Sequence, residues 1–220
     1  MRKTAKRATA RCWAVVLLLL LGCILPPKLP RGRMVIPLRV ERLLEEALRE
    51  ETDPDRLVYV RTACALTGQV GYFWGGKSHS LGWDGAWGWP RRVTAPGSET
   101  TGWIHPYGLD CSGFASWAAA AALEDPGAYE LVGEGVREQY ARSSPTLEPR
   151  PGDLAFYPDL SHVGVVLGRD RAGVIWVVHC SYSQGGVVVT PGSVGFIMYG
   201  TPEIFTEDGD IFHPTFQGID

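Results

Sequence analysis

The segment from Ser112 to Leu123 constrains the fold most strongly, because alanine and other apolar residues fill nearly all of its positions. Alanine has the highest helix propensity, and a helix that is apolar on every side lies in a protein interior. Asp110 precedes the segment as a helix-capping side chain, and Glu124-Asp125-Pro126-Gly127 ends it. These residues predict one buried helix that begins near Cys111 and forms the centre of the core.

The hydrophobic period changes along the chain, and this change predicts an α+β fold. Apolar residues follow helical spacing from 38 to 50, and Asp53-Pro54 supplies an N-cap and a first-turn proline for a second helix that ends near Gly68. The region from 128 to 148 is polar and irregular. Five short β-rich runs then alternate with turn residues; they are Leu154–Tyr157, Val163–Leu167, Val174–Val178, Val187–Thr190 and Phe196–Tyr199. Because no helix intervenes between these runs, we expect antiparallel strands that pack against the helices.

The N-terminus has the pattern of an export signal. Five basic residues precede an unbroken apolar run from Cys12 to Leu25, which is short for a membrane span but typical of a signal core. Leu20-Leu21-Gly22-Cys23 resembles a bacterial lipoprotein box, which would attach a lipid to Cys23, and a retained membrane anchor is the alternative. Both interpretations place the remaining chain outside the cytoplasm, either anchored in the cell envelope or secreted.

Composition and charge limit the classes of function. Apolar residues make up 45% and charged residues 20% of the chain, which is globular composition. Without the leader over 1–25, 16 basic and 24 acidic side chains remain. Such an acidic body disfavours nucleic-acid binding and suits a basic group or a free amine. We expect a monomer with a tether and helix over 26–52, one main domain over 53–200 and an acidic tail over 201–220.

The stretch from Ser78 to Gly108 has little periodic structure and holds four of the eight tryptophans, Trp83, Trp87, Trp89 and Trp103. Loops of this length in a domain are usually lids, binding loops or disordered segments, and the aromatic residues argue against disorder. Two interpretations remain. The stretch forms one wall of a binding groove, or its tryptophans pack as a satellite of the core.

Three cysteines lie outside the leader, so at least one thiol is unpaired. Cys111 stands at the predicted start of the buried helix, where unpaired backbone N–H groups favour a thiolate and can hold an oxyanion. Cys64 and Cys180 are interpreted as buried core residues, with a disulfide between them as the alternative. Cys111 is therefore the candidate nucleophile.

A base for Cys111 is expected on a β-hairpin, where His162 and His179 flank two consecutive β-rich runs. If the connecting loop is centred between Asp170 and Arg171, paired residue numbers sum to 341 and His162 lies directly opposite His179. One imidazole then orients the other, as the third member of a catalytic triad does. A slip of one residue would put the two rings on opposite faces of the sheet.

The sequence gives weaker support to other roles for its histidines and cysteines. His79, His105 and His213 are alternative bases, and His105 ranks low because it lies in the tryptophan-rich stretch. Cys111, both hairpin histidines and Cys180 carry the atoms that bind zinc. However, neighbouring strand residues point to opposite faces, so His179 and Cys180 do not easily share one ion. We therefore expect no metal and no other cofactor.

At these residues the chain resembles the NlpC family of papain-like cell-wall peptidases. The matching pieces occur in the family's order over roughly residues 55–200; they are Tyr72-Phe73-Trp74-Gly75-Gly76, Asp110-Cys111-Ser112-Gly113-Phe114, Pro151-Gly152-Asp153-Leu154, His162-Val163-Gly164-Val165-Val166-Leu167-Gly168, and Val178-His179 followed by Gly186-Val187-Val188. The resemblance implies a papain-like fold over 53–200, with the cysteine on the buried helix and both histidines on the sheet. The stretch over 78–108 is longer than the family's usual connection and is interpreted as an insertion.

The resemblance also implies a reaction. Cys111 would be the nucleophile, His162 the base and His179 the orienting residue. The implied substrate-binding residues are Tyr72, Trp74, Asp110 and Ser112, the last two holding a free amino group. The implied substrate is the peptidoglycan stem peptide, cut between γ-D-glutamate and the diamino acid. Two alternatives stay open: an amidase or acyltransferase that uses the same cysteine and histidines, and a non-catalytic wall-binding protein that uses the tryptophans.

Overall fold

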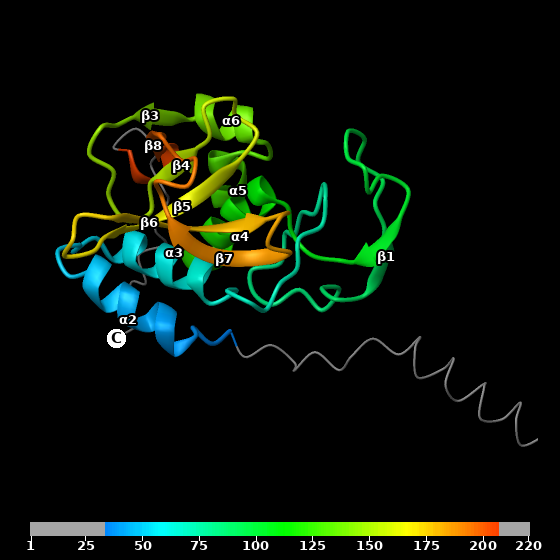
Figure 1. Ribbon diagram of the computed structural model, residues 1–220, viewed down its shortest axis with the longest axis horizontal. Helices are drawn as coiled ribbons and strands as arrows, with labels where there is room; N and C mark the ends of the chain where they lie inside the picture. Colours follow the sequence, from blue (N-terminus) through cyan, green and yellow to red (C-terminus); the bar gives the residue numbers. More distant parts are fainter. Residues whose placement is uncertain (1–33, 207–220) are drawn as a thin grey trace, which may run out of the picture.

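A computed structural model describes residues 34–206 and has helices packed on a six-stranded antiparallel sheet, so the α+β class is confirmed (Figure 1). The helices are α2 (Leu38–Ala47), α3 (Pro54–Cys64), α4 (Cys111–Leu123), α5 (Gly127–Val132), α6 (Val136–Ala141) and the 3-10 helix η1 (Glu203–Phe205). The sheet strands are β3 (Ser143–Pro145), β4 (Leu154–Phe156), β5 (Val163–Arg169), β6 (Ile175–Ser181), β7 (Gly186–Pro191) and β8 (Met198–Pro202). Their spatial order is β3-β8-β4-β5-β6-β7, so the last strand is inserted between the first two.

Helix α4 is the buried helix that the alanine-rich segment predicts. All its residues from Cys111 to Ala120 are buried, and it packs against α3, α5, β5 and β6. The Asp110 carboxylate accepts a hydrogen bond from the Gly113 N–H at 2.6 Å, which caps the first turn. The N-caps of α3 and α4 are therefore both as predicted, since Asp53 likewise accepts from the first turn of its helix.

The two faces of the sheet bury different groups. Alternate strand residues such as Val165, Val178 and Cys180 join the main core beneath α4. Their neighbours Val166 and Val177 point the other way and form a second, small apolar cluster with Ala155 and Phe196. Both faces of β5 and β6 are thus covered, which explains why these runs are almost continuously apolar.

The motif Pro151-Gly152-Asp153 fastens the start of β4 to α3. The Arg56 guanidinium donates to the Asp153 carboxylate at 2.8 Å and to the Pro151 carbonyl at 2.7 Å, and both charged side chains are almost fully buried. The Arg150 N–H and the Thr201 hydroxyl complete the bonds of the carboxylate. Breaking a buried ion pair by removing one partner costs about 3–5 kcal/mol. The motif therefore fixes the strand next to the β5–β6 hairpin.

Two parts of the body differ from expectation. The irregular region predicted over 128–148 contains α5, α6 and β3, because Tyr129, Val132 and Gln139 are buried against α4. Residues 201–206, which the sequence assigned to the tail, belong to the folded body, since β8 runs to Pro202 and the Phe205 ring packs against Tyr59 at 5.8 Å between centroids. Tertiary contacts decide both differences, because neither stretch has a clear period of its own.

The tryptophan-rich stretch contains a small ladder of β1 (Pro90–Arg92) with β2 (Ile104–Pro106), and Figure 1 shows β1 extending away from the sheet. Part of it packs on the core, as the satellite interpretation expects. Trp83 and Trp87 pack edge to face, and Trp87 continues onto Trp117 of α4. Trp89 and Trp103 are 57% and 61% exposed. The turn at 97–99 lines a pocket that is described below.

The export signal, Cys23 and His213 lie outside the described residues. Over 34–206, none of the helices has the length and apolar character needed to cross a membrane.

Candidate active site

Cys111 is the first residue of α4 and is 7% exposed. The backbone N–H groups of Val163 and Ser112 point at its sulfur closely enough to lower the pKa of the thiol. As the first helical residue, Cys111 also has a backbone N–H without a partner inside the helix. The thiol is thus surrounded by N–H donors from α4 and from the start of β5, and the residue before Val163 is His162.

The charge state of the free thiol follows from burial. Burial raises the pKa of Cys111 to about 11, and the neighbouring Asp110 carboxylate adds to the increase. The Val163 N–H, the Lys77 ammonium and the Ser112 N–H act in the opposite direction. The resting protein therefore holds a neutral thiol, and a base must remove its proton before the sulfur can react.

Three side chains form a hydrogen-bonded series across the sheet. His162 Nε2 lies 2.8 Å from His179 Nδ1, and His179 Nε2 lies 3.0 Å from the Thr190 hydroxyl. In the tautomers that leave Nδ1 of His162 free to accept a proton, His162 donates to His179 and His179 donates to Thr190. Each neutral ring then makes full use of its single N–H. The series can orient His162 as a base and can disperse the charge that a proton brings.

The predicted register of the hairpin is wrong by two residues. Val165 pairs with Val178, so paired numbers sum to 343 along this part of the ladder, and a bulge interrupts it between Val166 and Gly168. The turn also ends later than assumed, with the Asp170 N–H donating to the Val174 carbonyl. His162 and His179 are consequently diagonal neighbours and not direct partners. Because a shift of two residues preserves the face of a strand, their rings still meet.

Gly164 makes room for this diagonal contact. A Cβ atom at Gly164 would lie 2.9 Å from the Cβ of His179 and 2.5 Å from Cγ1 of Val177. Such contacts are far closer than packed side chains tolerate. The missing side chain therefore opens the space over which the His162 ring reaches His179.

Aromatic rings hold the two imidazoles on their outer side. Tyr157 lies edge-on to His162 at 5.1 Å between centroids, and Phe196 contacts both histidine rings at 5.6 and 5.2 Å. Burial lowers the pKa of His162 to about 4, and burial together with the charge of His162 lowers the pKa of His179 to about 3. Both rings are therefore neutral at pH 7, as a proton acceptor must be.

Asp110 and Ser112 are engaged within the protein. The Lys77 ammonium lies 2.9 Å from the Asp110 carboxylate and 2.7 Å from the Ser112 hydroxyl. The Asp110 carboxylate also accepts from the Ser112 hydroxyl at 3.0 Å. A cation of the chain itself thus occupies the place beside Asp110 where the resemblance implies a substrate amine.

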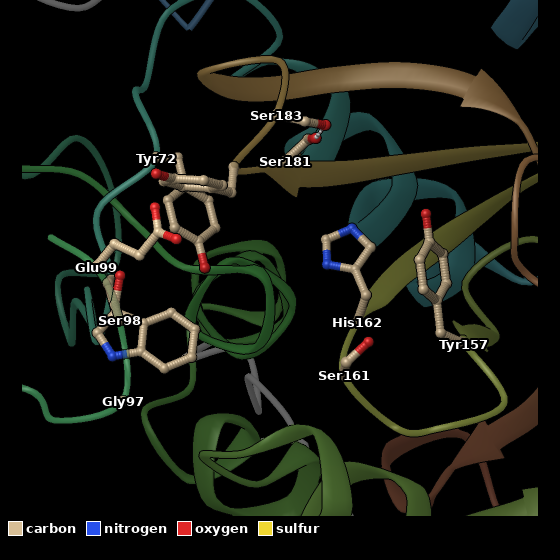
Figure 2. A pocket seen from close by; sticks show the side chains of 11 residues that line it. Tyr72, Gly97, Ser98, Glu99, Tyr157, Ser161, His162, Ser181 and Ser183 are labelled. Atoms are coloured by element: carbon tan, nitrogen blue, oxygen red, sulfur yellow. Dashed lines mark hydrogen bonds between the residues drawn. The ribbon is translucent and has the colours of Figure 1, made fainter.

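Tyr72 and Trp74 line a pocket of about 400 Å³ that also contacts His162 (Figure 2). The turn at 97–99, with Glu99, faces the wall that carries His162 and Tyr157. Burial is the main cause of the raised pKa of Tyr72, and Cys111 contributes electrostatically. The isolated bridge between Tyr72 and Leu109 places Tyr72 beside the segment that leads into Cys111.

The other histidines and cysteines considered from the sequence make contacts of their own. His79 packs on Tyr129 at 4.4 Å, and His105 stacks on Trp103 in the β1–β2 ladder. Cys64 and Cys180 are buried and unpaired, so the alternative disulfide is absent. The Cys180 thiol donates to the Leu109 carbonyl on the face of β6 opposite His179. Over 34–206, the His, Cys, Asp and Glu side chains form no group of three or more that could hold a metal ion.

Sequence reasoning missed Thr190 and Lys77. Thr190 ends a run of three valines on β7. Its sequence signal is the period of two along that strand, which becomes informative once the register pairs Val188 with His179. Thr190 therefore shares a face with His179. Lys77 follows a glycine pair and has no sequence signal of its own, because its partners Asp110 and Ser112 are more than thirty residues away.

Comparison of the chain with protein-family models, with curated proteins and with solved structures finds no match.

Proposed function

We propose that this protein is an exported cysteine peptidase with the papain-like fold of the NlpC family, and that it hydrolyses stem peptides of bacterial peptidoglycan. The observation that carries the proposal is the meeting of the Cys111 sulfur, at the start of α4, with the beginning of β5, where His162 starts the series to His179 and Thr190. Cysteine nucleophile, base and orienting group are the parts that acyl-transfer catalysis needs.

The proposed reaction begins with proton transfer from the Cys111 thiol to His162. The thiolate attacks the peptide carbonyl carbon, and the oxyanion that forms is stabilised by the Cys111 N–H and the Tyr72 hydroxyl. His162 then gives its proton to the leaving amine as the C–N bond breaks, which leaves a thioester. Water attacks the thioester while His162 takes its proton. The C–S bond breaks, the acid is released, and the thiol recovers its proton.

Burial of both groups couples the first proton transfer to the attack of the sulfur on the carbonyl. The thiol pKa is raised and the imidazole pKa is lowered, so charge separation is unfavourable until a substrate carbonyl accepts electron density. The hydrogen bonds from His162 to His179 and onward to Thr190 stabilise the imidazolium at the moment it forms.

The substrate class rests on the ordered motifs in the sequence, and location in the cell envelope rests on the N-terminal segment. The proposed bond lies between γ-D-glutamate and the diamino acid. The acidic body is compatible with a substrate that carries amines. No cofactor is part of the proposed reaction.

The test is digestion of purified muropeptides with the wild type and Cys111→Ala, with products identified by mass. We expect cleavage by the wild type and a loss of at least about 1,000-fold in Cys111→Ala. Cys180→Ala is the matched control, because this thiol is also buried but bonds to the Leu109 carbonyl. Cleavage by a folded Cys111→Ala protein would contradict the mechanism. Products from another amide, or transfer to an added amine, would support the amidase or acyltransferase alternative.

A further inference from the structure

The pocket beside His162 has one charged group at neutral pH. Its lining consists of aromatic residues, serines, a glycine, His162 and Glu99. Burial keeps the His162 ring neutral, since its pKa is lowered to about 4. The Glu99 carboxylate therefore gives the pocket a net charge of −1.

Glu99 has no partner of its own. Among residues 34–206, its carboxylate makes no hydrogen bond or ion pair. The carboxylate nearest the nucleophile, Asp110, differs because Lys77 and the Gly113 N–H already satisfy it. A cation that enters the site thus meets one unpaired anion, and that anion belongs to the insertion.

The turn that carries Glu99 is held in place. The Ser98 hydroxyl bonds to the Thr100 hydroxyl at 2.9 Å and accepts from the Thr100 N–H at 3.2 Å. The Thr101 hydroxyl donates to the Ala95 carbonyl at 2.8 Å, and the Trp74 indole donates to the Pro96 carbonyl at 2.9 Å. Trp74 itself lines the pocket. The carboxylate therefore stands on a structured wall, and ordering the loop adds little to the cost of binding.

Aromatic side chains next to Glu99 suit the same ligand. Tyr72 and Tyr182 lie edge to face at 5.4 Å between centroids and line the pocket with Trp74. Aromatic faces attract ammonium groups, and Figure 2 shows the Glu99 side chain on the same side of the pocket as Tyr72, across from His162. A volume of about 400 Å³ holds a short peptide segment.

We infer that Glu99 is a specificity-determining residue, which selects peptides that place a primary ammonium group in this pocket while the scissile carbonyl lies at Cys111. The inference rests on the proposed function and adds its substrate class. Lys77 already neutralises Asp110, so Glu99 is the carboxylate in the pocket that remains for an incoming ammonium group, and the turn at 97–99 becomes part of the specificity site.

The test uses three synthetic peptides. They are L-Ala-γ-D-Glu-L-Lys, its N-acetyl form without the terminal amine, and the norleucine form without the side-chain amine. We expect the wild type to prefer the peptide with the relevant ammonium by about 10- to 100-fold in kcat/KM, mainly through KM. Loss with the acetylated peptide identifies the terminal amine, and loss with the norleucine peptide identifies the side-chain amine.

Glu99→Gln is expected to reduce this preference to within about threefold, because it keeps the shape of the side chain and removes the charge. Glu148→Gln is the control, since its side chain is 90% exposed and does not line the pocket. A Glu99→Gln protein that discriminates as the wild type does would overturn the inference.

Binding to Cys111→Ala separates this inference from the proposed function. Affinities of the same three peptides are measured by calorimetry with and without Glu99→Gln. Discrimination in binding without hydrolysis by the wild type would support Glu99 and contradict the peptidase. Hydrolysis with equal use of all three peptides would support the peptidase and contradict Glu99. If the protein neither binds nor hydrolyses these peptides, the peptidase proposal and the role of Glu99 are both contradicted.

Discussion

A Cβ atom at Gly164 would stand 2.9 Å from the Cβ of His179, so the contact between His162 and His179 depends on a missing side chain on β5. His162 precedes β5, Gly164 is the second residue of that strand, and His179 lies on β6. The ring of His162 extends diagonally over the glycine to reach Nδ1 of His179 at 2.8 Å.

Gly164→Ala is therefore expected to move His179 and break the bond between the rings. We expect a loss of about 1–3 kcal/mol in the free energy of unfolding from overpacking and at least about tenfold in kcat. Denaturant unfolding and peptide cleavage measure the two effects. Gly85→Ala is the control, because Gly85 has an ordinary φ and open space where its Cβ would stand. Full activity in Gly164→Ala would show that the rings do not need this gap.

Thr190→Val removes the hydroxyl at the end of the hydrogen-bonded series and keeps the shape of the side chain. His179 Nε2 then loses its acceptor at 3.0 Å, and the tautomer that serves His162 is no longer favoured. We expect kcat to fall about tenfold with KM unchanged. Thr190→Ser keeps the hydroxyl and should retain most activity. An equal loss in the serine variant would point to packing as the cause.

Lys77→Met should make the Cys111 thiol less reactive. The Lys77 ammonium lowers the pKa of Cys111 directly and offsets the Asp110 carboxylate, which raises it. Both effects disappear with the cation, so the thiol pKa rises and the thiolate fraction at pH 8 falls. We expect alkylation by iodoacetamide to slow about three- to tenfold, after subtraction of the rate in Cys111→Ala. Lys77→Arg should react as the wild type does, and an unchanged rate in Lys77→Met would contradict the electrostatic role.

Stability should fall with acid over the range set by the two buried histidines. Their pKa values drop from 6.5 to about 4 and about 3 on folding, so the unfolded chain binds more protons once the pH falls below 6.5. The stabilisation that comes from keeping these histidines neutral is therefore fully present above pH 6.5, and the free energy of unfolding decreases as the pH falls toward 4. The measurement is Tm at pH 7.0, 5.5 and 4.5. His179→Gln should weaken this dependence, whereas His79→Gln, an exposed residue, should not. If Tm falls equally with acid in the wild type, His179→Gln and His79→Gln, then carboxylates and not His179 cause the loss of stability.

The sequence by itself determined the elements whose signals are local. Alanine content identified α4, the capping carboxylates Asp53 and Asp110 identified the starts of α3 and α4, and alternating turn residues identified five strands. These signals are reliable because a helix start and a buried strand each depend on residues within a few positions of one another.

Only the tertiary structure decided which side chains meet. A bulge between Val166 and Gly168 and a later turn shifted the hairpin register by two, and the period of two along a strand kept His162 and His179 on one face. Thr190, Lys77 and Glu99 reach the site from β7 and from segments before α4 that carry no period of their own. Their contacts join residues far apart in the chain, and long-range packing, which local sequence does not encode, sets those distances.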